Sequence, residues 1–153
     1  MAASSGAADA GFDDFIERCH AALKQQTHGD SEALLSLWSR ADDAAFLSPM
    51  GGYQLGFEQI SGLLRAAATT LDFEDWYADT LVKVVGGDVA HTVEIEHFSR
   101  RPDPARDSAW PDAAALRVTA VYRRENGDWR IVARHAQMYE DLKFPPYTDR
   151  VAS

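Results

Sequence analysis

A β-hairpin signature near the end of the chain constrains its fold more than any other feature. The pair Asn126-Gly127 separates two apolar-rich, strand-like runs at residues 116–124 and 129–135. An Asn-Gly pair between such runs is the strongest short-range signal for a hairpin, because both residues tolerate the positive φ of a tight turn. The sequence therefore predicts that the chain closes on two antiparallel strands.

The predicted hairpin carries three polar side chains that must face either solvent or a pocket: Arg117, Thr119 and His135. With a strict two-residue loop, Val118 lies opposite His135, and Arg117 points to the other face of the sheet. With Gly127 as the left-handed residue of a bulge, the pairing shifts by one residue, and Arg117 and Thr119 share the face of His135. We predict the bulge, and we expect the shared face to line a pocket.

The bulged register gives the hairpin two faces of different character. The predicted pocket face continues through Val121, Trp129, Ile131, Ala133 and Gln137. The opposite face is apolar enough to pack against a second subunit, so we expect a homodimer through this outer face of the sheet. The residues of the expected dimer face are Leu116, Val118, Ala120, Tyr122, Val132, Ala136 and Met138.

Upstream of the hairpin, apolar residues spaced three and four apart predict three helices. The first runs from Phe12 to Gly29, which is the expected terminator. The second is shorter and covers residues 34–38, with Asp30 as its N-cap. The third covers residues 57–67.

The remaining pattern is extended. Short strands at residues 42–49 and 53–55 precede the third helix, and longer strands at 73–85 and 89–99 follow it. Residues 100–111 contain three prolines and a tryptophan, and they form either a mobile flap over a pocket mouth or a solvated loop. Three helices followed by a long antiparallel meander define an α+β domain.

Length and composition fit one globular domain, which we place at residues 12–143 between a disordered tail (1–11) and an extended tail (144–153). The chain has 153 residues, of which 46% are hydrophobic and 25% charged, and its net charge is −9. That charge argues against nucleic acid and anionic membranes as partners. The single cysteine, Cys19, permits no intramolecular disulfide, and the first residues lack the features of a signal peptide, so we expect a cytoplasmic protein.

Further candidate site residues come from the strands and the aromatic residues. Period-two alternation places Glu94 and Glu96 on one face, which suits a polar patch at a pocket and equally suits solvent. Arg117 is a candidate to pair with Glu96 from the adjacent strand. We expect no metal, because Glu94 lies on the opposite face from His91 and His97. The aromatic residues that suit either a cavity wall or plain core are Trp38, Tyr53, Trp76 and Trp129.

These features together resemble a known family. The segments that carry the resemblance are residues 39–43, 49–57, 87–90, 94–97, 116–119 and 122–136. They are similar to the SnoaL-like proteins of the ketosteroid-isomerase and nuclear-transport-factor-like superfamily. The resemblance implies a cystatin-like, ketosteroid-isomerase-like cone, in which three N-terminal helices pack on a strongly curved antiparallel sheet around a ligand pocket. By resemblance, Arg117, Thr119 and His135 stand at pocket-lining positions.

The chain departs from the family pattern at two positions of the last strand. Relatives often carry a second histidine where this chain has Ala133, and an aspartate where it has Gln137. On the predicted pocket face, these changes remove a base and the carboxylate that would orient it.

Two functions follow from the sequence, and this fold hosts both enzymes and non-catalytic domains. In the first, the protein is a cofactor-independent acid/base enzyme of the isomerase, cyclase or hydrolase type that acts on an apolar metabolite. His135 is then the general acid/base, Arg117 stabilises an oxyanion or enolate, and Glu96 is the nearby carboxylate. The alternative is a non-catalytic dimeric module that binds a small apolar or carboxylate-bearing molecule with Arg117 as anchor.

Overall fold

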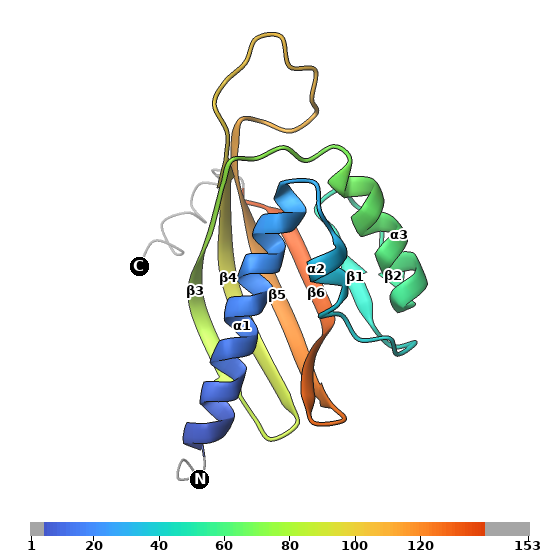
Figure 1. Ribbon diagram of the computed structural model, residues 1–153, viewed down its shortest axis with the longest axis vertical. Coiled ribbons are helices and arrows are strands. Elements are labelled where there is room, and N and C mark those ends of the chain that lie inside the picture. The colour runs from blue at the N-terminus through green and yellow to red at the C-terminus, as the bar shows by residue number, and fades with distance from the viewer. Residues whose placement is uncertain (1–4, 140–153) are drawn as a thin grey trace, which may run out of the picture.

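The computed structural model describes residues 5–139 as an α+β domain with three helices on one face of a curved, six-stranded sheet (Figure 1). The strands lie in the order β2-β1-β6-β5-β4-β3, and all neighbours are antiparallel except β1 and β6. The expected fold class is therefore confirmed. The element bounds are α1 (Ser5–Thr27), α2 (Glu32–Leu35), β1 (Ala45–Leu47), β2 (Gln54–Leu55), α3 (Gly56–Ala68), β3 (Asp75–Val85), β4 (Val89–Ser99), β5 (Ala113–Glu125) and β6 (Asp128–Met138).

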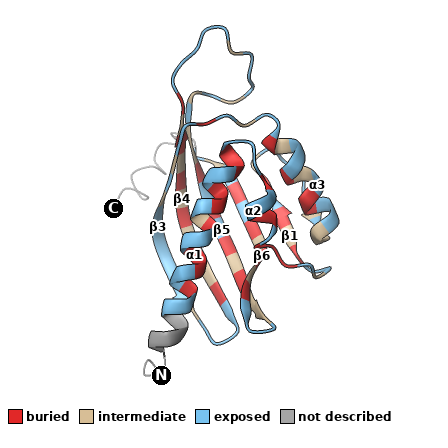
Figure 2. Cartoon of the chain, viewed as in Figure 1, coloured by how far each residue is buried: buried red, intermediate tan, exposed pale blue. Residues whose placement is uncertain are grey.

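Helix α1 lies along the sheet and covers its inner face (Figures 1 and 2). Its apolar residues at a spacing of three and four are buried, as the sequence predicts: Phe12, Phe15, Ile16, Cys19, Ala22 and Leu23. The helix begins at Ser5 rather than at Phe12, so residues 5–11 belong to α1 instead of the disordered tail we expected. It is followed by Gly29, whose φ of +94° is unfavourable for other residues.

The two shorter helices lie beside the β6–β1 part of the sheet (Figure 1). Helix α2 is shorter than predicted, and Trp38 instead makes a bridge to Ile131 of β6. The carboxylate of Asp30 accepts a hydrogen bond from the backbone N–H of Glu32 at 3.1 Å, although Ser31 is the residue next to the helix. Helix α3 buries Ile60, Ser61, Leu64 and Ala68.

The Asn126-Gly127 hairpin has a strict two-residue loop. Both residues have positive φ, 52° and 85°, and Glu125 pairs with Asp128 across the turn. This is the geometry of a type I′ turn. The prediction of a bulge at Gly127 is therefore wrong.

The bulge lies farther along, inside β6. Val121 pairs with Ala133 and Tyr122 pairs with Ile131, which leaves Val132 as the extra residue. Beyond the bulge, Thr119 lies opposite His135, as in the register we predicted. The extra residue, however, reverses which residues of β6 face the helices on its two sides. Trp129 therefore faces the helices and is buried, whereas His135 faces away from them and is exposed.

The sheet therefore has an inner face toward the helices and an outer face away from them. The inner face, toward the helices, buries Leu116, Val118, Ala120, Tyr122 and Ala136, which are five of the seven residues we had assigned to a dimer interface. That assignment of residues is wrong, because α1 and the neighbouring core cover them. The homodimer itself stays a prediction. The expected extended tail at residues 144–153 lies outside the described residues.

Candidate functional site

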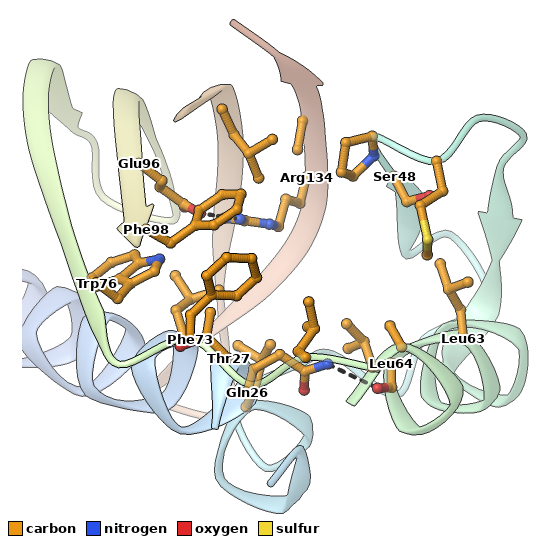
Figure 3. A pocket seen from close by; sticks show the side chains of 18 of the residues that line it. Gln26, Thr27, Ser48, Leu63, Leu64, Phe73, Trp76, Glu96, Phe98 and Arg134 are labelled. Atoms are coloured by element: carbon orange, nitrogen blue, oxygen red, sulfur yellow. Dashed lines mark hydrogen bonds and ion pairs between the residues drawn. The ribbon is translucent and has the colours of Figure 1, made fainter. Parts of the chain in front are cut away.

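A mostly apolar cavity lies between the end of α1, helix α3 and the inner face of the sheet (Figure 3). Its volume is about 90 Å³, and it is partly open to solvent, so a ligand larger than this volume can extend out of it. The apolar walls come from Leu23, Leu34, Phe46, Pro49, Met50, Leu63, Leu64, Ala67, Leu71, Phe73, Trp76, Phe98, Trp110, Leu116 and Ala136. The polar side chains of the lining are those of Gln26, Thr27, Ser48, Glu96 and Arg134.

An ion pair lies at the centre of the site. It joins β4 and β6, which lie on either side of β5. Arg134 Nη2 of β6 donates to Glu96 Oε1 of β4 at 2.6 Å, and both residues are buried. Burial opposes the charge on Arg134, but the adjacent Glu96 carboxylate raises the pKa of the guanidinium above its ordinary value. Arg134 therefore stays charged.

Two oxygens on the cavity-lining side chains accept no hydrogen bond from the described residues: Glu96 Oε2 and Gln26 Oε1. Gln26 sits on α1, and its amide orientation is fixed because Nε2 donates to the backbone oxygen of Leu64 in α3 at 2.8 Å. Buried polar atoms in folded proteins nearly always have a partner. Each of these two oxygens is closed off from solvent and belongs to a residue that lines the cavity.

A second buried polar group lies on the inner face beside the cavity. Glu94 Oε2 accepts hydrogen bonds from His20 Nε2 of α1 at 2.8 Å and from Thr80 Oγ1 of β3 at 2.7 Å. Burial alone would raise the pKa of Glu94, but these two hydrogen bonds prevail and hold it below its ordinary value of 4.5. This cluster ties α1 to the sheet, and none of its three residues lines the cavity.

Deeper on the same face, two further titratable groups are held neutral. Burial raises the pKa of the Cys19 thiol and of the Tyr122 phenol far above their usual ranges. The Tyr122 hydroxyl is hydrogen-bonded to Thr92 Oγ1 at 2.9 Å. These groups belong to the core rather than to a reactive site.

The segment between β4 and β5 contributes one wall of the cavity. Trp110 packs edge-on against Phe73 and Phe98, with ring centroids 6.3 and 5.8 Å apart. Arg100 is buried and anchors the segment through ion pairs with Asp72 and Asp112. The base of this segment is therefore part of the cavity wall, whereas its tip extends beyond the sheet (Figure 1).

The structure separates the residues that we had grouped into one site. Glu96 and Trp76 line the cavity, and Glu94 is buried next to it. Arg117 and His135 share the outer face of the sheet, and together with Gln137 both line a second, more open pocket there. Neither residue lines the inner cavity. The other residues we proposed also lie elsewhere: Trp38 and Trp129 are buried in the core, Thr119 is exposed on the outer face, and Tyr53 is 67% exposed.

The expected pairing of Arg117 with Glu96 is also wrong. Arg117 lies opposite Ile95 and donates to Gln137 Oε1 at 3.1 Å, while Glu96 lies opposite Leu116. Side chains at opposed positions share a face, so Arg117 and Glu96 point to different sides of the sheet. Ala133 and Gln137 are on the outer face as well, so the two departures from the family pattern remove nothing from the cavity.

Sequence reasoning missed Arg134, Gln26 and His20. Gln26 follows Leu23 by three residues and so continues the buried stripe of α1. That spacing was a usable signal. The inward position of Arg134 depends on the bulge at Val132, for which the sequence carries no comparable marker.

Residues 5–139 were also searched for metal-binding clusters and for membrane-spanning helices. No group of three or more His, Cys, Asp or Glu residues in this part of the chain is arranged to hold a metal ion. Within the same residues, no helix combines the length and the apolar character needed to cross a membrane.

Comparison with known structures defines the class of this fold. An NTF2-like superfamily protein from Salmonella enterica superposes with a TM-score of 0.70 at 18% identity, covering 94% of this chain and 99% of that one. A ketosteroid isomerase-like protein from Erwinia carotovora gives 0.67 at 15% identity, covering 86% and 95%. A protein with a cystatin-like fold from Caulobacter vibrioides gives 0.65 at 16% identity, covering 95% and 96%. At these identities the likeness establishes the fold.

The family follows from the sequence comparison. Residues 14–139 match the model of the SnoaL-like domain. The protein therefore belongs to the SnoaL-like family. No curated protein matches the chain.

Proposed function

We propose that the protein binds a small, largely apolar molecule in the cavity, and that Glu96 acts on it as a general base without a cofactor. The observation that carries the proposal is the buried Glu96 carboxylate among the residues that line the cavity, with one oxygen on Arg134 and the other without a hydrogen-bond donor from the described residues. A carboxylate in an apolar site can remove a proton from a bound molecule.

Arg134 has two functions in this proposal. It holds Glu96 Oε1, which leaves Oε2 as the oxygen that accepts the proton. It also stabilises negative charge that develops on a substrate oxygen after the proton leaves, and this effect is stronger beside apolar walls than in bulk water. Arg134 thus replaces Arg117 as the cationic residue of the site, and Glu96 replaces His135 as the base.

The proposal can be tested with benzisoxazole, a small apolar molecule that reports on a buried base. Removal of its ring C–H proton breaks the N–O bond and gives cyanophenolate, which is followed by absorbance. Glu96→Gln keeps the length of the side chain but cannot take up the proton, so we expect turnover to fall by about 10²–10⁴-fold. Circular dichroism and thermal denaturation establish that the variant is folded.

His135→Ala is the matched control, because His135 lies on the outer face of the sheet, outside the cavity. We expect it to keep the turnover of the natural protein. Equal rates for the natural protein and Glu96→Gln would overturn the assignment of the base. Absence of turnover above the buffer rate would overturn catalysis and favour the alternative, a non-catalytic binding module.

A further inference from the structure

A second pocket lies on the outer face of the sheet, on the side of β6 that faces away from the helices (Figure 1). It is open to solvent and has a volume of about 430 Å³. We call it the outer pocket, and its lining includes the side chains of Leu47, Pro49, Arg117, His135, Gln137 and Met138. It contains neither member of the buried ion pair at the inner cavity.

The segment that follows β1 forms one wall of the outer pocket. Strand β1 runs parallel to β6, with Leu47 beside His135, and the chain then turns at Gly51 and Gly52. The φ angles of these glycines, +92° and +70°, are unfavourable for other residues. The Gly51 backbone N–H also donates to the Ser48 carbonyl oxygen at 3.1 Å. The sequence therefore specifies the conformation of this wall.

Arg117 gives the outer pocket a positive charge, although the chain as a whole has a net charge of −9. No Asp or Glu of the described residues lines the pocket. Arg117 makes no ion pair within residues 5–139, and the residues opposite it on the adjacent strands, Ile95 and Gln137, are uncharged. The acidic residue in the same row is Asp79, which lies two strands away and pairs with His97 at 3.1 Å.

The Arg117 side chain is held in position by a neutral partner. Its Nη2 donates to Gln137 Oε1 at 3.1 Å. A guanidinium has five N–H donors in a planar fork, so this bond leaves a pair of donors for a ligand. Apolar contact is available beside it from Leu47, which is 38% exposed, and from Met138.

We propose that the outer pocket binds a small carboxylate with an apolar body, and that Arg117 is its anchor. The two oxygens of a carboxylate match the paired donors of a guanidinium. A cationic group would be repelled by Arg117, and no carboxylate of the described lining would compensate for that repulsion. The inference goes beyond the proposed function, because it adds an anion site outside the cavity that contains Glu96.

Benzoate and benzamide test the inference as matched probes, because they share a ring and a planar substituent but differ in charge. Affinities are measured by ligand-observed NMR or calorimetry at millimolar concentration. We expect benzoate to bind at least about fivefold more tightly, because only the carboxylate makes two charge-assisted hydrogen bonds with Arg117. Saturating benzoate should leave the KM for benzisoxazole unchanged, since the two molecules occupy opposite faces of β6.

Three variants locate the effect. Arg117→Met removes the charge and the donors, so it should abolish the preference for benzoate. Arg117→Lys keeps the charge but lacks the planar fork, so only part of the preference should remain. Arg65→Met is the matched control, because Arg65 is an exposed arginine on α3 outside the outer pocket. It should leave the preference unchanged, since salt screens distant surface charges.

Equal affinity for benzoate and benzamide, or a preference that Arg117→Met leaves intact, would overturn the inference. So would an equal loss in Arg65→Met, which would show a general effect of charge. A KM for benzisoxazole that rises in proportion to benzoate would place benzoate in the inner cavity and would also overturn it. A benzoate preference that depends on Arg117, in a protein without benzisoxazole turnover, supports the outer pocket and rejects only the proposed base.

Discussion

The two faces of the sheet carry similar residue types but place them in opposite environments. On the inner face, Glu96 and Arg134 form a buried ion pair beside an apolar cavity. On the outer face, Arg117 and Gln137 form a hydrogen bond that is exposed to solvent. The comparison shows that the candidate chemistry depends less on which polar residues a strand carries than on which of them face the helices.

The same contrast holds for two pairs of histidine and carboxylate. His20 and Glu94 meet between α1 and the inner face, where Glu94 is 3% exposed. His97 and Asp79 meet on the outer face at 3.1 Å, and the Asp79 side chain is 61% exposed. Water screens the outer pair and weakens it, whereas the inner pair interacts at lower effective dielectric.

The largest expected effect on stability is the separation of Glu96 from Arg134. Arg134→Met should lower the free energy of unfolding by about 3–5 kcal/mol, because it leaves a buried carboxylate without its cation. The double variant Glu96→Leu with Arg134→Met should recover most of that loss, since a buried ion pair contributes little more than apolar residues of similar volume. Urea denaturation measures both changes.

The outer-face control for this experiment is Arg117→Met, the same substitution on an exposed arginine. A loss comparable to that of Arg134→Met would contradict the difference between the two faces. So would a double inner-face variant that is no more stable than the single one.

The next effect in size concerns Glu94. Glu94→Gln should lower the free energy of unfolding by about 1–3 kcal/mol at neutral pH, because it removes a buried acceptor of charge-assisted hydrogen bonds. The pKa of folded Glu94 lies below its ordinary 4.5, so its stabilising contribution is fully present above pH 4.5 and is lost as the pH falls through the lower, folded value. The difference between the natural protein and the variant should therefore shrink in acid.

Asp79→Asn on the outer face is the counterpart, and it should change stability by less than about 0.5 kcal/mol at neutral pH. Denaturation curves at neutral pH and below pH 4.5 test the pair. A Glu94→Gln deficit that grows as the pH falls would show that the sign of the Glu94 contribution is wrong.

A smaller effect is expected at the turn that begins β6 and sets its pairing. Gly127→Ala should cost about 1–2 kcal/mol, because Gly127 has a φ of +85° and no atom lies within 4 Å of an added Cβ. The penalty is therefore conformational rather than a clash. Thermal denaturation measures it, and a variant as stable as the natural protein would contradict the type I′ geometry.

The smallest effect is expected on the outer face. His135→Ala and Thr119→Ala should each change the free energy of unfolding by less than about 0.5 kcal/mol, because both side chains are exposed. Neither should alter the turnover of benzisoxazole. A loss of turnover in either variant, with stability unchanged, would return the site to the face predicted from the sequence.

Most of the fold could be predicted from the sequence because it depends on local patterns. The spacing of Phe12, Phe15 and Cys19 predicts the buried stripe of α1, and Asn126-Gly127 predicts the hairpin. The alternation of β4 also placed Glu94 and Glu96 on one face. These signals rest on the periods of helices and strands, which each segment shows by itself.

The site was harder to predict because it depends on one extra residue in a strand. A constant period of two carries the face of Trp129 and Ile131 through to His135, and that assumption wrongly placed His135 on the same face as Trp129. The bulge at Val132 breaks the period and turns Arg134 inward instead. Asn126-Gly127 carries no information about where along β6 such a bulge occurs.

The measurement that tests this account most directly is fluorine NMR of the Glu96→Gln protein, labelled with 5-fluorotryptophan and titrated with benzisoxazole, which this variant is expected to bind without turnover. The chain has four tryptophans: Trp76 and Trp110 line the cavity, whereas Trp38 and Trp129 do not. A ligand in the cavity should give the largest, saturable shifts at Trp76 and Trp110. Unchanged resonances at both, or shifts confined to Trp38 and Trp129, would contradict the assignment of the site to the inner face.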